Sequence, residues 1–295
     1  MAMQAIGYSL AVSGAFVGSL YLLVPSRIRK LDRNDIRQIQ WRSFATSVIC
    51  VGSLASYRYM FGDYQQQSFM GSFSVYNGVI LGDAGRVVLH SVTLYLGPVL
   101  QGMLQVHESN KQQTDYGIRV FWKSYYAAFC QSITRPIWKP LHESERWIRL
   151  RNLVIAPIAE EICFRGCIAS ALATTGMSIA RVTWVAPLFF GTAHLHHALV
   201  RLYEKQGISM VLLQMAFQFA YTTLFGAYAT YAFLCTRSIV AVSLSHSVCN
   251  SMGLPDLAFM KSSSSVHEYR RLLWAAHVAG IVGFAMGFRW SLVFP

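Results

Sequence analysis

Apolar residues run in long blocks along this chain, and charged residues gather between the blocks. A helix needs about 20 mostly apolar residues to cross the hydrocarbon core of a bilayer. The segment 70–82 is too short and too rich in glycine to span, and is expected to be re-entrant or interfacial. The predicted fold is all-α and polytopic, with about eight transmembrane helices. These helices are expected at about residues 5–25, 43–62, 87–106, 152–173, 178–198, 208–234, 238–254 and 272–294.

The composition agrees with residence in a bilayer. Hydrophobic residues make up 54% of the 295 residues, charged residues make up 13%, and the mean hydropathy is +0.37. Soluble domains usually carry about 25% charged residues. We expect one membrane-embedded domain over residues 1–295, without an internal repeat. We expect no cleaved signal peptide, because positive charges follow the first apolar block and do not precede it.

The net charge of +12 is concentrated in the predicted loops. If the N-terminus is lumenal, the cytosolic loops hold nineteen of the 25 Lys and Arg residues, and these loops are 26–42, 107–151, 199–207 and 255–271. This bias follows the positive-inside rule, so topology and contact with anionic lipid explain the charge, and nucleic acid is not an expected partner. The loop at about 107–150 also mixes Trp and Tyr with the cations, which predicts an amphipathic interfacial segment or a substrate platform.

The fourth predicted span carries charges that need a reason. Ionised side chains inside a span cost about 2.5–3.5 kcal/mol each on insertion scales, so they are candidates for function. Glu160 and Glu161 point about 100° apart on a helix, whereas Glu161 and Arg165 have the spacing of a helical ion pair. We therefore predict that Arg165 holds Glu161 as support, and that Glu160 faces a polar cavity as a general base or acid. The alternative is that both carboxylates are structural.

The fifth span holds three His residues near its cytosolic end. His194 is the deepest, and His197 follows on roughly the same face of a continuous helix. His196 is expected to face away from His194. The simplest reading of His196 and His197 is solvation at the membrane interface.

The seventh span places His246 and Asn250 on one face, one turn apart. Two side-chain N–H donors on one face can bind a developing oxyanion, although a hydrogen-bonded pair that joins two spans is the favoured explanation when these residues are taken alone. Counting helical rise from the predicted span ends places all the candidate groups within roughly 6–13 Å of the cytosolic boundary. A shared depth predicts one cavity open to the cytosol, and its candidate residues are Glu160, His194, His246 and Asn250.

These stretches resemble the type II CAAX prenyl endopeptidases, the family of the Ras-converting protease of the endoplasmic reticulum. Members carry Glu-Glu-x-x-x-Arg, Phe-x-x-x-His and His-x-x-x-Asn on three membrane helices. The corresponding residues here are Glu160-Glu161…Arg165, Phe190…His194 and His246…Asn250. The residues around these motifs, for example Phe-Phe-Gly-x-Ala-His-x-His-His, are similar to those of the eukaryotic branch of the family. The resemblance covers about residues 150–255 clearly, which is the expected catalytic core, and loop 26–42 loosely.

The resemblance implies a glutamate-type endopeptidase of the endoplasmic reticulum membrane, with its active site facing the cytosol. Such an enzyme removes the last three residues from a C-terminal Cys-a-a-X whose Cys bears farnesyl or geranylgeranyl. By resemblance, Glu160 and His194 activate the water, His246 and Asn250 stabilise the oxyanion, and Glu161 and Arg165 support the site. The implied partners are membrane lipid and prenylated CaaX proteins such as Ras-like small GTPases, and no cofactor is implied.

Three alternatives stay open. A zinc ion could activate the water without an HExxH motif, and its ligands would be Glu160, Glu161, His194 and His246. Cys163 or Cys249 could be a nucleophile, although buried thiols in apolar helices are usually inert. A transporter or scaffold could use buried Glu and His as a proton relay, but a relay needs ionisable groups across the full bilayer depth.

Overall fold

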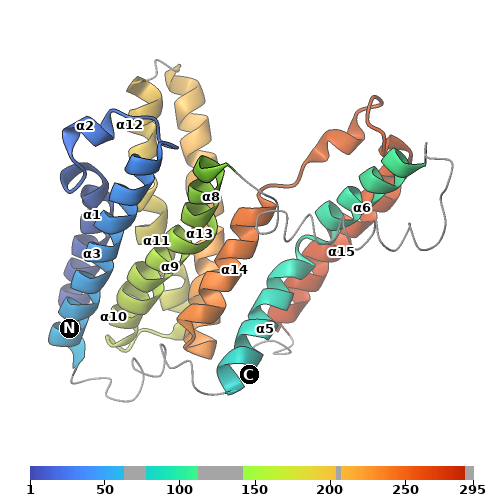
Figure 1. Ribbon diagram of the computed structural model, residues 1–295. Helices are drawn as coiled ribbons and strands as arrows, with labels where there is room; N and C mark the ends of the chain where they lie inside the picture. Colours follow the sequence, from blue (N-terminus) through green and yellow to red (C-terminus); the bar gives the residue numbers. More distant parts are fainter. Residues whose placement is uncertain (63–77, 112–141, 204–206, 290–295) are drawn as a thin grey trace. The chain divides into compact units, whose positions relative to one another are not determined.

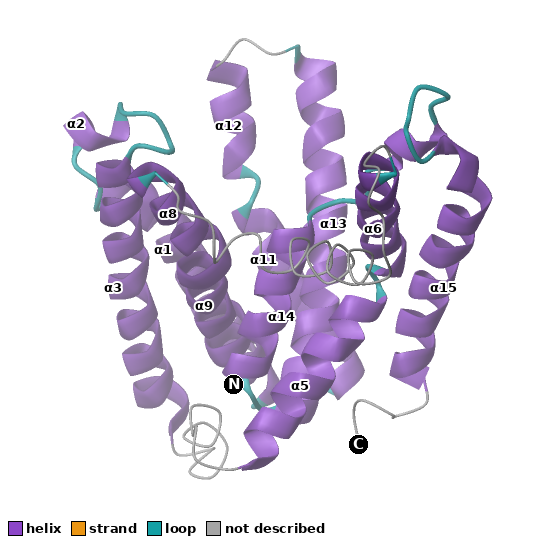
Figure 2. Ribbon diagram, turned by 45° about the vertical axis from the view of Figure 1, so that its right-hand side comes forward, coloured by secondary structure: helices purple, strands orange, loops and turns teal. Residues whose placement is uncertain are grey.

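The computed structural model describes residues 1–62, 78–111, 142–203 and 207–289. Within these ranges the regular structure is all helical and contains no strand, which confirms the predicted all-α class (Figure 2). The predicted segments 70–82 and 107–150 lie largely outside the described residues.

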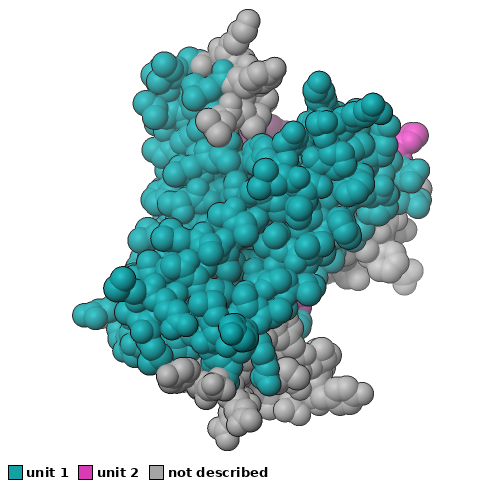
Figure 3. Space-filling view, turned by 90° about the vertical axis from the view of Figure 1, so that its left-hand side faces the viewer, with its two compact units in different colours: residues 1–84, 143–243 teal, residues 85–142, 244–295 magenta. Residues whose placement is uncertain are grey.

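The chain divides into two compact units (Figure 3). The first comprises residues 1–84 and 143–243, and the second comprises residues 85–142 and 244–295. The motif-bearing segment 150–255 therefore passes from the first unit into the second.

The first unit is a bundle of helices from the N-terminal and central parts of the chain (Figure 1). In chain order they are α1 (Ala2–Leu22), α2 (Ser26–Arg29), α3 (Ile36–Phe61), α8 (Glu143–Leu150), η2 (Arg151–Ile155), α9 (Ala156–Glu161), η3 (Ile162–Ala169), α10 (Ser170–Ala173), α11 (Ile179–Ala193), α12 (His196–Tyr203) and α13 (Ile208–Thr236). Helix α14 (Ile239–Met252) begins in this unit and ends in the second.

Residues 143–173 form one unbroken helix, the motif helix, which runs from α8 through α10 and includes two π-helical stretches. Pro157 lacks the N–H that would bond to the carbonyl of Leu153, and this carbonyl belongs to the first π-helical stretch, which ends at Ile155. π-helical turns occur where the regular hydrogen-bond ladder is interrupted, often at functional sites. The second stretch, η3, is buried and packs against α1, α3 and α11, so the motif helix is the centre of the first unit.

Helices α11 and α13 share the most extensive contact of the first unit. A glycine allows their close approach, because a Cβ built on Gly226 would lie 2.8 Å from the Cβ of Pro187 and 3.4 Å from a guanidinium nitrogen of Arg165. Small residues at helix interfaces give the tight packing on which membrane helices depend.

Gly226→Ala is expected to destabilise the protein by about 1–3 kcal/mol, because the added methyl overpacks this interface. The measurement is thermal unfolding in detergent. Gly52→Ala is the matched control, since a Cβ at Gly52 in α3 meets nothing within 4 Å and alanine favours a helix. Equal midpoints for the two variants would contradict close packing at Gly226.

The second unit consists of α5 (Gly78–Thr93, which begins in the first unit), α6 (Leu96–Asn110), the end of α14, η4 (Leu257–Met260), η5 (His267–Tyr269) and α15 (Arg270–Arg289). Helices α6 and α15 pack against each other. This unit has a small hydrophobic core of Phe259, Val266 and Leu273, all fully buried.

Two helices in the described part of the chain, α1 and α13, are long and apolar enough to cross a membrane. The pair Gly82–Thr93 and Leu96–Ser109, bent by 68°, supplies a third if it counts as one span. The other predicted spans coincide with α3, the motif helix, α11, α14 and α15, which do not meet the same criterion of length and hydropathy. The sequence therefore encodes helices that can cross a membrane, although fewer than the predicted number meet this criterion.

The segment predicted to span at 87–106 is not one straight helix, because the chain bends by 68° between Thr93 and Leu96. Pro98 explains the bend. Its ring carries no N–H for the carbonyl of Leu94 and would clash with that carbonyl in a continuous helix.

Candidate active site

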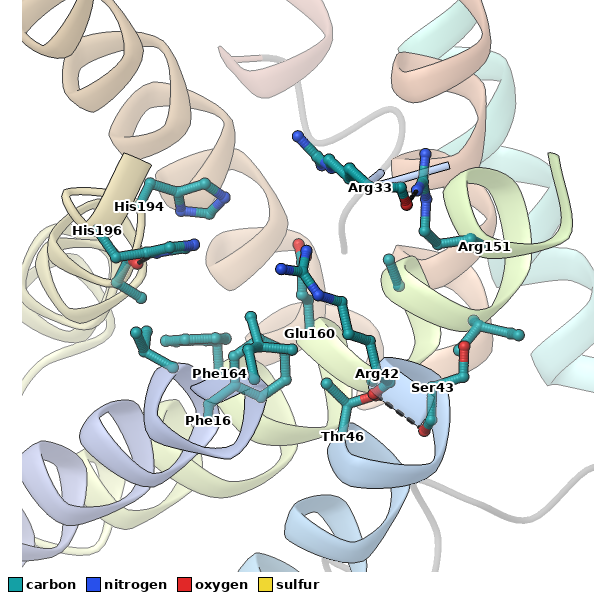
Figure 4. A pocket seen from close by; sticks show the side chains of 16 residues that line it. Phe16, Arg33, Arg42, Ser43, Thr46, Arg151, Glu160, Phe164, His194 and His196 are labelled. Carbon is teal, nitrogen blue, oxygen red and sulfur yellow. Dashed lines mark hydrogen bonds between the residues drawn. The ribbon is translucent and has the colours of Figure 1, made fainter. Parts of the chain in front are cut away.

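A cavity of about 140 Å³ lies within the first unit (Figure 4). Helices α1 and α3, the motif helix and the segment around the end of α11 contribute its walls. One wall is apolar and includes Phe16, Leu20 and Phe164, whereas Glu160 and His194 are among the polar residues. The cavity thus brings together Glu160 and His194, one polar residue from each of two of the three sequence motifs.

The two adjacent carboxylates separate as helical spacing predicts. Glu160 is half-buried and lines the cavity. Glu161 is completely buried, and its Oε1 lies 3.1 Å from Nη1 of Arg165, so the predicted ion pair is confirmed. The carboxylate of Glu161 is held by Arg165 inside the bundle, whereas Glu160 is among the residues that line the cavity.

Arg165 is embedded in the core of the first unit, with 1% of its surface exposed. Besides the ion pair with Glu161, its Nη2 donates to the backbone oxygen of Gly226 at 3.4 Å. Its guanidinium lies over the rings of Phe190 and Phe225, at 4.7 and 5.7 Å from their centroids. Arg165 therefore ties the motif helix to α11 and α13, close to the residues that carry the site.

His194 follows the last residue of α11 and lines the cavity. Its Nδ1 lies 2.8 Å from the carbonyl oxygen of Phe190, and since a carbonyl only accepts, Nδ1 carries the hydrogen. In that tautomer Nε2 is the basic nitrogen. The ring also packs edge-to-face on Phe190, which packs in turn on Phe164 of the apolar wall, so its orientation is fixed.

His196 also lines the cavity, and the prediction that it faces away from His194 is wrong. That prediction assumed a continuous helix. Helix α11 instead ends at Ala193, and a tight turn, in which the N–H of Leu195 donates to the oxygen of Thr192, re-aims the chain before α12 begins. His196 Nδ1 then lies 2.6 Å from the oxygen of Ala193. The side chain of His197 lies outside the described residues.

Three arginines also belong to the polar lining, and sequence reasoning did not single them out. Arg33 and Arg42 come from the N-terminal part of the chain, and Arg151 comes from the motif helix (Figure 4). In the sequence they belong to the cytosolic loops whose positive charge the positive-inside rule explains. The sequence feature that could have indicated Arg33 and Arg42 is the high density of cations in loop 26–42. This loop resembles the family only loosely.

The geometry bears on the two alternative chemistries, a Cys nucleophile and a zinc ion. Cys163 is fully buried and is not among the residues that line the cavity; its Sγ lies 3.7 Å from that of Cys50. Among the described residues no three His, Cys, Asp or Glu side chains are grouped so that they could hold a metal ion. Glu161, one of the four suggested zinc ligands, is paired with Arg165.

His246 and Asn250 lie on α14, four residues apart on one helix face, in the part that belongs to the second unit. His246 is buried, and Asn250 is exposed. Their predicted position opposite Glu160 and His194 stays a prediction.

Comparison with known proteins agrees with the three motifs. The family model described as type II CAAX prenyl endopeptidase Rce1-like matches residues 142–252, a range that holds all six predicted site residues. CAAX prenyl protease 2 of Homo sapiens is 38% identical over 145 residues, which are 49% of this chain and 42% of the human protein. No solved structure matches the chain significantly.

Other relatives, among them the following two, match over most of their length. Probable CAAX prenyl protease 2 of Schizosaccharomyces pombe is 32% identical over 256 residues, which cover 84% of this chain and 80% of the relative. CAAX prenyl protease 2 of Arabidopsis thaliana is 27% identical over 302 residues, which cover 99% of this chain and 91% of the relative. With the motifs in order and a relative matched along four fifths of its length, the chain belongs to the type II CAAX prenyl endopeptidase family of proteases.

Proposed function

We propose that this chain is a polytopic membrane endopeptidase that removes the last three residues from farnesylated or geranylgeranylated CaaX proteins. The observation that carries the proposal is that Glu160 and His194, from separate helices, line one cavity. Relatives named CAAX prenyl protease 2 support the substrate class.

In the proposed reaction Glu160 and His194 activate a water molecule. The carboxylate of Glu160 accepts a proton as the water oxygen attacks the scissile carbonyl carbon. Since Nδ1 of His194 is held by the oxygen of Phe190, Nε2 is the nitrogen that would orient the water or take its proton. The apolar wall limits the water around this pair, which strengthens the electrostatic interactions inside the cavity.

Attack on the carbonyl produces a tetrahedral oxyanion, which needs hydrogen-bond donors. We assign this role to His246 and Asn250, whose spacing allows both side chains to donate from one face of α14. When the intermediate collapses, the C–N bond breaks and the proton taken from water passes to the leaving amine. The products are the shortened protein, now ending in its prenylated Cys, and a tripeptide.

The topology of the proposal follows the charge distribution. With about eight spans and a lumenal N-terminus, the cavity opens to the cytosol in the endoplasmic reticulum membrane. A prenylated tail, such as that of a Ras-like small GTPase, would then reach it from the cytosolic leaflet. The apolar residues Phe16, Leu20 and Phe164 are chemically suited to a neighbouring lipid chain.

The test compares a farnesylated Cys-a-a-X peptide with its unprenylated twin, using the purified full chain in lipid vesicles. We expect kcat/KM to be at least about 10²-fold higher for the farnesylated peptide, because each buried methylene contributes about 0.8 kcal/mol. Release of the tripeptide is followed by mass spectrometry. Equal cleavage of both peptides would remove the prenyl specificity, and cleavage of neither would remove the proposed function.

A further inference from the structure

The cavity that holds Glu160 and His194 is also lined by three guanidinium groups. Arg33 lies in the loop before α3, Arg42 lies near the start of α3, and Arg151 lies at the start of η2. Figure 4 shows the Arg42 side chain extending from α3 into the cavity that Glu160 and His194 line. Segments distant in the sequence thus converge to place positive charge beside the candidate catalytic pair.

None of these three cations forms an ion pair in the described part of the chain. The buried Nε of Arg42 makes no hydrogen bond there either. The nearby carboxylate of Asp35 is bonded to Arg37, at 3.3 Å. Arg42 is nonetheless half-buried, so its charge is partly removed from water without compensation.

Arg151 is held in place by the loop that carries Arg33. Its Nη1 donates to the backbone oxygen of Arg33 at 3.0 Å, and its Nη2 donates to Oδ1 of Asn34 at 3.1 Å. These bonds fix the guanidinium of Arg151 against the loop before any ligand arrives, whereas the Arg33 side chain is exposed. A fixed arrangement of donors binds an anion at a lower entropic cost than mobile side chains would.

The three charges repel one another. Burial, followed by the charge of Arg33, lowers the pKa of Arg42. Burial, followed by the charges of Arg33 and Arg42, lowers the pKa of Arg151, and the opposing effect of Asp32 is smaller. Arginine remains protonated in proteins, so the cluster keeps its charge and an anion between its members would relieve the repulsion.

The proposed reaction supplies a suitable anion. The segment to be removed ends in a free carboxylate three residues beyond the scissile bond, and three extended residues span roughly 10 Å. Carboxylates accept two parallel hydrogen bonds from a guanidinium fork. An enzyme that cuts at a set distance from a chain end needs a group that recognises that end.

We propose that Arg42, together with Arg33 and Arg151, binds the C-terminal carboxylate of the substrate and thereby sets cleavage three residues from the chain end. This inference rests on the proposed function. The cluster would discriminate against internal peptide segments, which have no carboxylate to fill it. Anionic lipid is a second source of negative charge at this face, and the experiment separates the two.

The experiment uses two farnesylated peptides that differ only at the C-terminus, one a free acid and one an amide, with the full chain in vesicles of neutral lipid. We expect the native chain to cleave the acid with a kcat/KM roughly 10- to 100-fold above that for the amide. Arg42→Gln is expected to bring this acid-to-amide ratio close to one, and Arg42→Lys to retain part of it. Arg37→Gln is the matched control, because Arg37 is an exposed cation of the same helix outside the cavity, and its ratio should equal that of the native chain.

Each result has a defined meaning. An acid-to-amide ratio near one in the native chain, or an unchanged ratio in Arg42→Gln, would overturn the inference while leaving the proposed function intact. If Arg42→Gln lowers cleavage of both peptides equally, and only in vesicles with anionic lipid, the cluster binds lipid phosphate and the inference is overturned. Cleavage of neither peptide by the native chain would be a failure of the proposed function itself. If Arg42→Gln does not fold, the exposed Arg33→Gln is measured in its place against the same expectation.

Discussion

Replacing Glu160 with Gln is expected to lower kcat/KM for a prenylated Cys-a-a-X peptide by about 10²–10⁴-fold, the range that a general acid–base group contributes. The substitution keeps the size of the side chain and removes its ability to accept a proton at neutral pH. Because Glu160 is half-buried beside a cavity and is not the partner of Arg165, folding should be preserved. His194→Gln is expected to show a loss of similar size, since it removes the second group of the pair.

The measurement is steady-state cleavage of the farnesylated peptide, with thermal unfolding as a check that each variant is folded. Glu145→Gln is the matched control, because Glu145 is an exposed carboxylate on the same helix and is absent from the cavity lining. It should keep native activity. Native activity in a folded Glu160→Gln variant would contradict the assignment of Glu160 as base.

The two alternative chemistries are tested in the same assay. Cys163→Ala is expected to retain cleavage, because Cys163 contacts Cys50 in the core and does not line the cavity. Activity is also expected to survive prolonged chelation. Loss of cleavage in a folded Cys163→Ala variant would support a thiol nucleophile, and loss on chelation that is reversed by added zinc would support a metal.

Arg165→Met is expected to destabilise the protein by about 3–5 kcal/mol, the cost of leaving one member of a buried ion pair without its partner. Arg165 is 1% exposed and Glu161 is fully buried, so water cannot compensate the carboxylate that remains. The substitution also removes the bond to Gly226 and the contact with the ring of Phe190. Because Phe190 orients His194, activity should fall in whatever fraction stays folded.

A double variant distinguishes an unpaired charge from simple loss of packing. Glu161→Gln combined with Arg165→Met leaves no buried charge, so most of the lost stability should return. Arg181→Met is the surface control, since Arg181 is exposed on α11 and should change stability by less than about 0.5 kcal/mol. The midpoints of thermal unfolding in detergent report all three. A double variant as unstable as Arg165→Met would mean that packing, and not charge, dominates.

Much of the site can be predicted from local sequence because it depends on helical geometry. Residues one apart must diverge by about 100°, which separates Glu160 from Glu161. Residues four apart must share a face, which pairs Glu161 with Arg165. The structure contains both features. The apolar blocks likewise predict the all-α class, because only helices or closed barrels satisfy the backbone within lipid.

Predictions were weaker where a helix ends or bends. The orientation of His196 depends on α11 ending at Ala193, and a helix projected through that point turns the side chain the wrong way. The bend before α6 has a local cause in Pro98. Counting apolar residues to find spans does not detect such a bend.

The sequence by itself determined the helical class, the family, and the local pairing of the carboxylates, because each depends on residues close together in the chain. Only the tertiary structure decided which segments meet at the cavity. It placed Phe16 of α1 and the arginines Arg33 and Arg42 beside Glu160, more than a hundred residues later in the chain. Such contacts follow from how apolar helix faces pack, and no local periodicity encodes which faces meet. The sequence shows three polar motifs. The structure adds the apolar residues and the three arginines that line the same cavity as Glu160 and His194.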